Sequence, residues 1–409
     1  MRKLGNTIAT LARYRRQWAA TLQTVAGPRA RHEPVPAVAG HLNEEKGFGS
    51  NPGALRMFTY LPANLESSTP LVVVLHGCTQ SAAAYDLGAG WSTLADRFGF
   101  ALLLPEQTPA NNPKTCFNWF LPGDSARDRG EALSIRQMIE RMILDHGIDR
   151  SRIFITGLSA GGGMTSAMLA VYPEVFGAGA IIAGLPYGTA ANVQQAFESM
   201  FQGRVRSPQE WGDEVRTASK HRGPWPRVSV WHGDLDATVK PINADSIVQQ
   251  WTNVHGIGSD PKTEMVDGYR RQVWRRDGVD VTESYTITGM GHGTPLATGS
   301  SDQAYGEAGP FLLDVGISSS YHIATFFGLT GKVQAKAAKG VNEARDTARA
   351  SLVPDDRVEI IPDEKVEILD AKSARGKPRY QDTPRSGQID VMSIITKALT
   401  SAGLMKPPV

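Results

Sequence analysis

An apolar run leads directly into a serine flanked by glycines, in the order Arg152-Ile153-Phe154-Ile155-Thr156-Gly157-Leu158-Ser159-Ala160-Gly161. The run predicts a buried strand, and the glycines remove the Cβ atoms that would block a sharp turn from a strand into a helix. A serine at such a turn stands exposed, where its hydroxyl can attack a carbonyl. Because the G-x-S-x-G pattern also arises by chance in a chain with 42 glycines, its meaning depends on the residues that follow it.

A candidate acid follows a second strand-like run. A serine hydroxyl is a weak nucleophile and needs a base, which in turn needs an acid to orient it. In α/β-hydrolases these residues follow in the order serine, acid, histidine, each after a strand. The apolar run 228–233 precedes Asp234 and Asp236, and Pro241 then opens a predicted helix. The pattern H-G-x-x-D-x-x-V favours Asp236 as the acid, with Asp234 as the alternative.

The candidate base is one of three histidines that lie beyond the acid, His255, His292 and His322. His292 follows the alternating run 281–288 and lies in a glycine-rich loop, which suits the presentation of an imidazole. His255 trails a predicted helix, and His322 lies inside another. The sequence therefore predicts His292 as the base.

The chemistry also requires backbone N–H groups that stabilise the oxyanion of the tetrahedral intermediate. In this fold one donor is the residue after the nucleophile, here Ala160, and the other lies on the loop after the third strand. The apolar run 71–75 ends in a His-Gly-Cys sequence. We therefore expect the Cys78 N–H to be the second donor and His76 to shape this loop beside the substrate. His232, in the other His-Gly pair, is expected to be structural.

Several blocks together resemble one family of esterases. They are His76-Gly77-Cys78-Thr79-Gln80, Cys116-Phe117-Asn118-Trp119-Phe120, Gly157-Leu158-Ser159-Ala160-Gly161-Gly162, Ala183-Gly184-Leu185-Pro186-Tyr187-Gly188 and Gly289-Met290-Gly291-His292-Gly293-Thr294-Pro295. These blocks resemble the poly(3-hydroxybutyrate) depolymerase family, which includes feruloyl and acetylxylan esterases. The resemblance covers about residues 50 to 330. The histidine loop and the Cys116 block are more similar to the polyester depolymerases of the family.

The resemblance implies a serine esterase that hydrolyses short-chain polyhydroxyalkanoate esters, poly- or oligo-3-hydroxybutyrate, through an acyl-enzyme. It implies Ser159 as nucleophile, Asp236 as acid, His292 as base, and the Cys78 and Ala160 amides as oxyanion donors. A feruloyl or acetylxylan esterase is the alternative within the enzyme class. A polyester-granule-binding protein without catalysis is the alternative of another class.

The same resemblance places further residues near the cleft. Trp119 and Tyr187 lie in blocks that border the family's cleft, where they would contact an apolar polyester chain or belong to the core. Cys78 and Cys116 should meet there as well. They would form a disulfide in an oxidising compartment or remain thiols in the cytosol.

The order of apolar runs predicts an α/β-hydrolase fold, with a mainly parallel central sheet and helices on both faces. The expected strands are 57–62, 71–76, 100–105, 152–157, 178–183, 228–233 and 281–288. A long helix is expected over about 125–147. The segment of about 185–226 is the expected position of a lid, in which Trp211 would line the cleft, with plain packing as the alternative.

Composition and the chain ends set the domain organisation. The catalytic domain is expected over 46–330, after a basic amphipathic segment over 1–45 and before a flexible, charged tail over 331–409 with a short terminal helix. Residues 1–32 either dock on the catalytic domain or adsorb to a lipid or polyester granule surface.

The remaining expectations concern partners and compartment. A formal charge of +2 gives no field that favours nucleic acid, and neither a metal-ligand spacing nor a membrane-spanning run appears. No cofactor is expected. The lack of a secretory signal pattern favours the cytoplasm.

Overall fold

The computed structural model describes residues 41–331, apart from residues 64, 66–67 and 259. The expectations for the amphipathic segment before residue 41 and for the tail after residue 331 lie outside the described residues.

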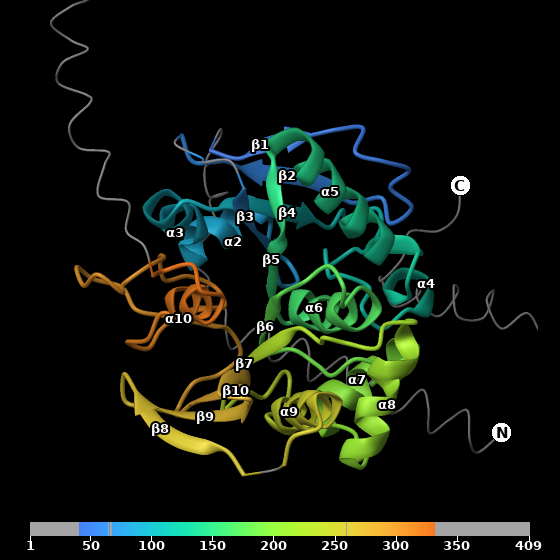
Figure 1. Ribbon diagram of the computed structural model, residues 1–409, viewed down its shortest axis with the longest axis vertical. Coiled ribbons are helices and arrows are strands. Elements are labelled where there is room, and N and C mark those ends of the chain that lie inside the picture. Colours follow the sequence, from blue (N-terminus) through green and yellow to red (C-terminus); the bar gives the residue numbers. More distant parts are fainter. Residues whose placement is uncertain (1–40, 64, 66–67, 259, 332–409) are drawn as a thin grey trace, which may run out of the picture. The chain divides into compact units, whose positions relative to one another are not determined.

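A ten-stranded sheet forms the centre of the described part (Figure 1). The strands are β1 (Asn43–Glu45), β2 (Arg56–Tyr60), β3 (Thr69–Leu75), β4 (Ala101–Glu106), β5 (Ile148–Leu158), β6 (Ala178–Ile182), β7 (Arg227–Gly233), β8 (Lys262–Val266), β9 (Tyr269–Arg276) and β10 (Val279–Ile287). Their order is β1-β2-β4-β3-β5-β6-β7-β10-β9-β8. The neighbours from β4 to β10 pair in parallel, and the outer strands pair antiparallel. The expected mainly parallel sheet is confirmed.

Helices cover both faces of the sheet. One layer holds α5 (Gly130–His146), α6 (Ala160–Val171), α7 (Val193–Gln202), α8 (Pro208–Ala218) and α9 (Ile242–His255). The other holds α2 (Ala82–Ala89), α3 (Trp91–Phe98) and α10 (Ser319–Phe326), and Figure 1 shows this layer opposite α5 and α6. Short α4 (Pro122–Ser125) precedes α5, and a separate parallel pair is formed by β11 (Thr294–Leu296) and β12 (Leu312–Asp314).

The central strand β3 shows why the apolar runs are uninterrupted. Leu71, Val73 and Leu75 point into the core beneath α5 and α6, while Val72 and Val74 point into the core beneath α2, α3 and α10. All five side chains are at most 1% exposed. A parallel strand with helices on both faces buries both sets of side chains, so alternation disappears from its sequence.

Three strands of the ten-stranded sheet were not expected, and neither was the separate β11–β12 pair. β8 and β9 form an antiparallel hairpin around Asp267 and Gly268, both with positive φ, so the Asp-Gly pair was an available signal. Their mixed polar and apolar sequences concealed them. β1 lies within the segment expected to precede the catalytic domain, so the sheet begins ahead of residue 46.

The long helix expected from about residue 125 begins later. α5 starts at Gly130. Asp128 and Gly130 have φ values of 61° and 43°, so no continuous helix runs into α5 from residue 125. The expectation of one continuous helix over 125–147 is therefore wrong at its start. Only the short α4 occupies the earlier part.

The segment 185–226 is packed against the domain through α7 and α8. Trp211, expected on a lid wall, is 0% exposed. The Gln250 side chain on α9 donates hydrogen bonds to the carbonyls of Trp211 and Tyr187, at 3.1 and 3.0 Å. Plain packing therefore accounts for Trp211.

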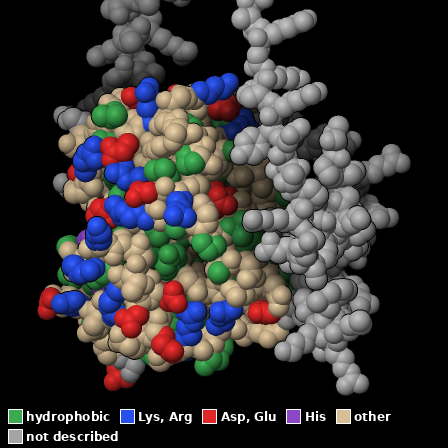
Figure 2. All heavy atoms as spheres, turned by 90° about the vertical axis from the view of Figure 1, so that its right-hand side faces the viewer, with side chains coloured by type: hydrophobic (Ala, Val, Ile, Leu, Met, Phe, Trp, Pro, Cys, Tyr) green, Lys and Arg blue, Asp and Glu red, His purple; other side chains and the backbone are tan. Residues whose placement is uncertain are grey.

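The surface carries charge of both signs. On the face seen in Figure 2, basic and acidic side chains are interspersed. Within the ranges that the structure describes, no helix is long and apolar enough to cross a membrane. The same ranges hold no group of three or more His, Cys, Asp and Glu that suits a metal ion.

Candidate active site

Three parallel strands bring Ser159, His292 and Asp236 together. Ser159 follows β5, Asp236 follows β7 and His292 follows β10, so all three leave the same edge of the sheet. His292 Nε2 lies 2.9 Å from Ser159 Oγ, and His292 Nδ1 lies 2.7 Å from Asp236 Oδ2. Because Nδ1–H faces a carboxylate, the Nε2 lone pair is free to accept the serine proton. This is the geometry that general base catalysis requires.

The turn at Ser159 is as sharp as the motif predicts. Ser159 has φ 58° and ψ −114°, outside the regions that non-glycine residues favour. A Cβ on Gly157 would lie 2.5 Å from the Gly161 carbonyl carbon, and a Cβ on Gly161 would lie 2.4 Å from Leu75 O. Both glycines are therefore required by close packing, and the start of α6 lies against the end of β3.

The Asp236 carboxylate is buried and well supplied with donors. It is 1% exposed, and its Oδ1 accepts the N–H groups of Thr238 and Val239 at 2.8 and 2.9 Å. Its Oδ2 lies 3.3 Å from His232 Nε2 as well as beside His292. Burial alone would raise the pKa of Asp236, but the two histidines lower it more, and the net pKa lies well below its usual value. Asp236 is therefore ionised and can stabilise an imidazolium.

The alternative acid and the other histidines have different partners. Asp234 Oδ1 accepts the Gly289 N–H at 2.7 Å, which ties the histidine loop to the loop after β7. His255 Nε2 donates to a backbone carbonyl at 3.1 Å, and His322 pairs with Asp267. Of the candidates, it is Asp236 that contacts His292.

The backbone N–H groups of Cys78 and Ala160 have no acceptor among the described residues, and the loops that carry them meet where Gly77 lies against Leu158. Their neighbours are engaged, since the Gly77 N–H donates to a side-chain carbonyl at 2.9 Å and the Thr79 N–H donates to Lys114 O at 2.7 Å. Ala160 is the first residue of α6, where the helix dipole favours negative charge. This arrangement suits an oxyanion.

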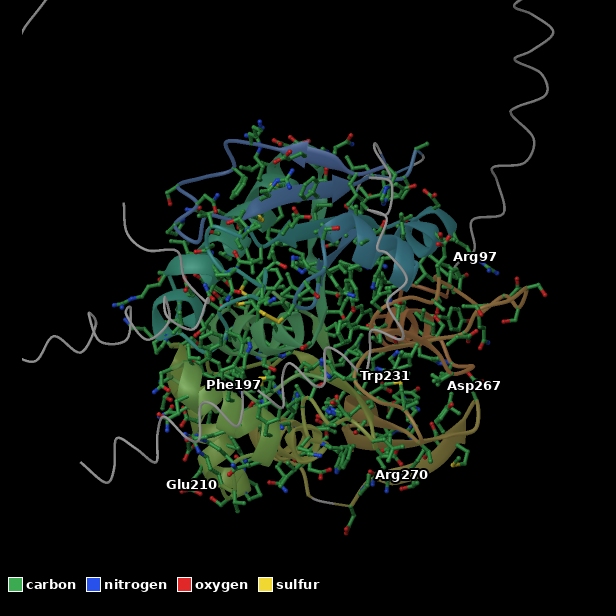
Figure 3. The ribbon with its side chains drawn as sticks, turned by 180° about the vertical axis from the view of Figure 1, so that it is seen from behind. Arg97, Phe197, Glu210, Trp231, Asp267 and Arg270 are labelled. Carbon is green, nitrogen blue, oxygen red and sulfur yellow. A yellow bond between two sulfur atoms is a disulfide. The ribbon has the colours of Figure 1, made fainter. Side chains whose placement is uncertain are left out.

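A disulfide joins the loop after β3 to the loop after β4. Cys78 and Cys116 are bridged, with 4.3 Å between their Cα atoms, and Figure 3 draws the bond in yellow. Of the two redox states left open by the sequence, the structure contains the bridge.

His76 shapes this loop from inside the core. It is 1% exposed, its Nδ1–H donates to Gly77 O at 2.8 Å, and its Nε2 accepts the Gln107 N–H at 3.1 Å. Burial lowers the pKa of His76, which keeps the ring neutral as these two hydrogen bonds require. The expectation that His76 contacts substrate is wrong, because its ring is enclosed.

Sequence comparisons identify known proteins that are similar to this chain. The family model described as esterase, PHB depolymerase, matches residues 55–273. Poly(3-hydroxyalkanoate) depolymerase C of Paucimonas lemoignei is 47% identical over 293 residues, which cover 71% of this chain and 70% of that protein. The chain belongs to the PHB depolymerase esterase family. It is accordingly an ester hydrolase.

Other relatives of this esterase have names that refer to different esters. An acetylxylan esterase of Coprinopsis cinerea is 36% identical over 64% of this chain and 72% of that protein. A solved acetyl xylan esterase from Aspergillus awamori superposes with a TM-score of 0.61 at 26% identity, covering 71% of this chain and all of that one. The expected α/β-hydrolase fold is confirmed.

The two aromatic residues expected at the cleft differ in how deeply they are buried. Trp119 is 9% exposed and packs on α6, since a Cβ on Gly163 would lie 2.7 Å from its Cγ. It therefore belongs to the core beneath the nucleophile. Tyr187 is half-buried, and its backbone N–H donates to Gln250 Oε1 at 3.1 Å.

Two residues near the triad were not assigned to it from the sequence. His232 was expected to be structural, yet its Nε2 lies beside Asp236 as well as 2.8 Å from Val239 O. No sequence pattern marks Phe311, whose ring lies 6.0 Å from the His292 ring, centroid to centroid. The H-G-x-x-D spacing is a signal for His232, whereas Phe311 lies in an irregular stretch that carries none.

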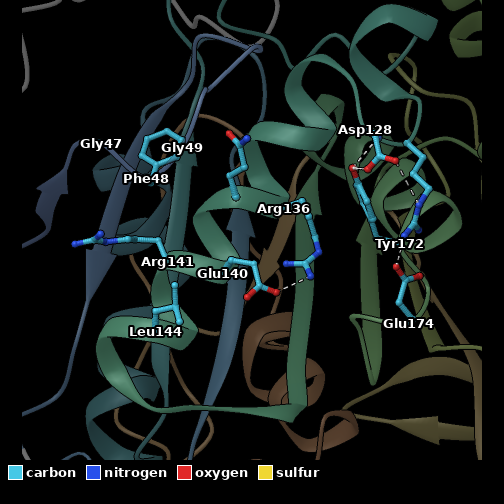
Figure 4. A pocket seen from close by; sticks show the side chains of 12 residues that line it. Gly47, Phe48, Gly49, Asp128, Arg136, Glu140, Arg141, Leu144, Tyr172 and Glu174 are labelled. Atoms are coloured by element: carbon cyan, nitrogen blue, oxygen red, sulfur yellow. Dashed lines mark hydrogen bonds and ion pairs between the residues drawn. The ribbon is translucent and has the colours of Figure 1, made fainter.

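A separate cavity of about 550 Å³ lies away from the triad (Figure 4). Arg127, Arg136, Arg141, Glu140, Glu174 and Tyr172 are among its lining residues. Its arginines are neutralised, because Arg127 pairs with Glu174, Arg136 with Glu140 and Arg141 with Asp145. The cavity therefore offers no unpaired positive charge to an anionic ligand.

Proposed function

We propose that this protein is a serine esterase that hydrolyses the ester bonds of short-chain polyhydroxyalkanoates, poly- or oligo-3-hydroxybutyrate. The observation that carries the proposal is the continuous hydrogen-bonded chain from Ser159 through His292 to the buried Asp236. An acyl-enzyme mechanism requires such a chain at a sharp turn beside free backbone amides.

In the proposed mechanism Ser159 Oγ attacks the ester carbonyl while His292 Nε2 takes its proton. The carbonyl oxygen becomes negative and accepts the N–H groups of Cys78 and Ala160, each of which contributes about 3 kcal/mol. His292 then gives the proton to the alcohol oxygen, the ester C–O bond breaks, and the alcohol leaves. Water, deprotonated by His292, hydrolyses the acyl-enzyme in the second half.

The polyester substrate is supported by similarity, since identity to the polyhydroxyalkanoate depolymerase is 47% and to the acetylxylan esterase 36%.

The polyester substrate is also supported by an apolar rim, which we define as Val193, Val205, Leu235 and Ile242. These are four of the seven large apolar side chains that are exposed in the described part, and they lie on the connections after β6 and β7. The Lys240 N–H donates to Met200 O at 2.8 Å, which joins the two connections. Exposed apolar side chains on connections that leave the same sheet edge as the triad suit a water-insoluble polymer.

The Cys78–Cys116 bridge also bears on the compartment. Disulfides persist in oxidising environments, so the bridge supports maturation there rather than in the cytoplasm that the sequence favoured. Alkylation of the protein isolated from its host measures this directly. Two freely alkylated thiols would contradict maturation in an oxidising compartment.

A substrate panel tests the proposed function. Wild type and Ser159→Ala are compared on amorphous poly(3-hydroxybutyrate), 3-hydroxybutyrate oligomers, methyl ferulate and acetylated xylo-oligosaccharides, with Ser301→Ala as an exposed control. We expect 3-hydroxybutyrate release from wild type and from the control, and loss of nearly all activity in Ser159→Ala. Release of ferulate or acetate without 3-hydroxybutyrate would instead assign a carbohydrate ester. Polymer binding without hydrolysis of any ester would leave a granule-binding protein.

A further inference from the structure

Phe311 lies against the imidazole of the triad. Its ring and that of His292 are 6.0 Å apart, centroid to centroid, and nearly perpendicular at 77°. Phe311 is half-buried, so part of its ring surface is open. It immediately precedes β12, which pairs in parallel with β11, the strand that follows the histidine loop.

The backbone of Phe311 is held in an unusual conformation. Its φ is 63°, a left-handed value that a bulky residue adopts only at a cost in free energy. The Phe311 carbonyl accepts the Thr294 N–H at 2.8 Å, and a Cβ on Gly293 would lie 2.8 Å from that same oxygen. Gly293 and Thr294 follow His292 directly. The two strands therefore fix the aromatic ring and the imidazole relative to each other.

A second connection reaches the oxyanion loop. Gln80 Nε2 donates to Pro310 O at 3.5 Å, and Gln80 Oε1 accepts the Gly77 N–H at 2.9 Å. The residue before Phe311 is thus linked to the loop that carries the Cys78 amide. Such constraints from both sides of the site are what a strained backbone needs in order to persist.

The position of Phe311 relates it to one half of the ester. When His292 passes the serine proton to the alcohol oxygen, the Ser159 O–C bond has formed and the ester C–O bond breaks. The alcohol oxygen must then lie within hydrogen-bond reach of His292 Nε2. A ring that packs against the substrate side of the imidazole would therefore line the alcohol half of the ester, not the acyl half.

We propose that Phe311 is a specificity-determining residue that selects esters with an apolar alcohol half. In a polyester the leaving alcohol is the next 3-hydroxyacyl unit, with its methyl and methylene groups. In an acetylated xylan it is a sugar that carries several hydroxyls, to which a phenyl ring offers no hydrogen bonds. The proposal rests on the proposed function, because it names the group that distinguishes polyester from carbohydrate esters at the same triad.

The test uses two esters that share one acyl group and differ in the alcohol. Acetate release is followed from tert-butyl 3-acetoxybutyrate and from an acetylated methyl xyloside, with wild type, Phe311→Ala and Phe311→Leu. We expect Phe311→Ala to lower kcat/KM about 10-fold for the acetoxybutyrate ester and less than about 3-fold for the xyloside. Phe311→Leu should recover most of the loss, because it restores an apolar contact.

Two controls separate specificity from folding. Phe311→Gly relieves the left-handed φ and removes the ring, so it should show the same change in the ratio of the two kcat/KM values as Phe311→Ala. Phe98→Ala, at a half-buried ring on α3, should change both esters by the same factor. Equal losses on both esters in all Phe311 variants would overturn the proposal. The proposed function fails separately, when wild type releases no acid from 3-hydroxybutyrate oligomers.

Discussion

At the scale of single residues, the two aspartates after β7 show how position gives identical side chains different partners. Asp234 is exposed and binds a backbone amide of the histidine loop, whereas Asp236 is buried and contacts His292. Burial raises the pKa of Asp236, but His292 and His232 lower it more, so the carboxylate stays charged where an imidazolium forms. The sequence pattern favoured Asp236, and its catalytic role stays a prediction.

Replacing Asp236 with Asn should preserve the fold and lower kcat about 10⁴-fold, because the amide no longer holds the imidazole in the tautomer that accepts the serine proton. Steady-state kinetics on p-nitrophenyl butyrate measure the effect. Asp234→Asn is the matched control, with less than about 10-fold loss expected since it touches only the loop backbone. Activity of Asp236→Asn within about 10-fold of wild type would refute the assignment.

Residue-level prediction succeeded where chemistry limits the choice. A serine at a strand end, an acid and a histidine in a set order leave few candidates, and the structure places the three favoured residues in contact. Phe311 could not be predicted from the sequence near it. Its position beside His292 depends on the pairing of β11 with β12. His76 was misplaced because the sequence does not show that its ring is enclosed.

At the scale of elements, α9 ends in a buried histidine. His255 Nε2 donates to the Pro226 carbonyl, and burial lowers the pKa of His255 from its usual 6.5 to about 4. The unfolded chain therefore takes up a proton at higher pH than the folded protein. The stability that this neutral histidine contributes is present above pH 6.5 and is lost as the pH falls from 6.5 towards 4.

His255→Gln keeps a donor and removes the titration. Between pH 7.5 and 4.5, wild type should lose about 2–3 kcal/mol more unfolding free energy than the variant, as urea unfolding at the two pH values would measure. Other histidines titrate in both proteins and cancel in the difference. Parallel losses would show that His255 does not account for acid sensitivity.

Elements were predictable in proportion to their burial. The parallel strands between α-helical layers read as apolar runs, and all seven expected strands are present. The β8–β9 hairpin and the start of α5 depend on turns, where short signals such as Asp-Gly outweigh hydrophobic pattern. The segment 185–226 lies between β6 and β7, and its packing on α9, which replaces the expected lid wall at Trp211, follows from contacts such as those of Gln250.

At the scale of the whole molecule, the apolar rim lies on connections that leave the same sheet edge as the triad. Val205 is 93% exposed and Leu235 67% exposed, although nothing within the described residues requires apolar side chains there. Apolar surface exposed on one side of a molecule marks a site where a partner binds. A solid polyester surface is such a partner.

The double variant Val205→Gln with Leu235→Gln should lower hydrolysis of amorphous polymer about 10-fold or more, because each apolar side chain buried on adsorption contributes about 1.5–3 kcal/mol. Hydrolysis of soluble oligomers should change much less. Val279→Gln, half-exposed at the start of β10 and so at the opposite sheet edge, is the control. Equal losses on polymer and oligomers would count against adsorption through this rim.

The most direct test of the account is to trap the acyl-enzyme. Wild type is mixed with 3-hydroxybutyrate oligomers, quenched with acid within milliseconds and digested. The masses of the peptides are then measured by mass spectrometry. The account predicts 3-hydroxybutyryl groups on the peptide that contains Ser159, and none in Ser159→Ala. Product release with Ser159 unmodified, or with the acyl group on another residue, would contradict it.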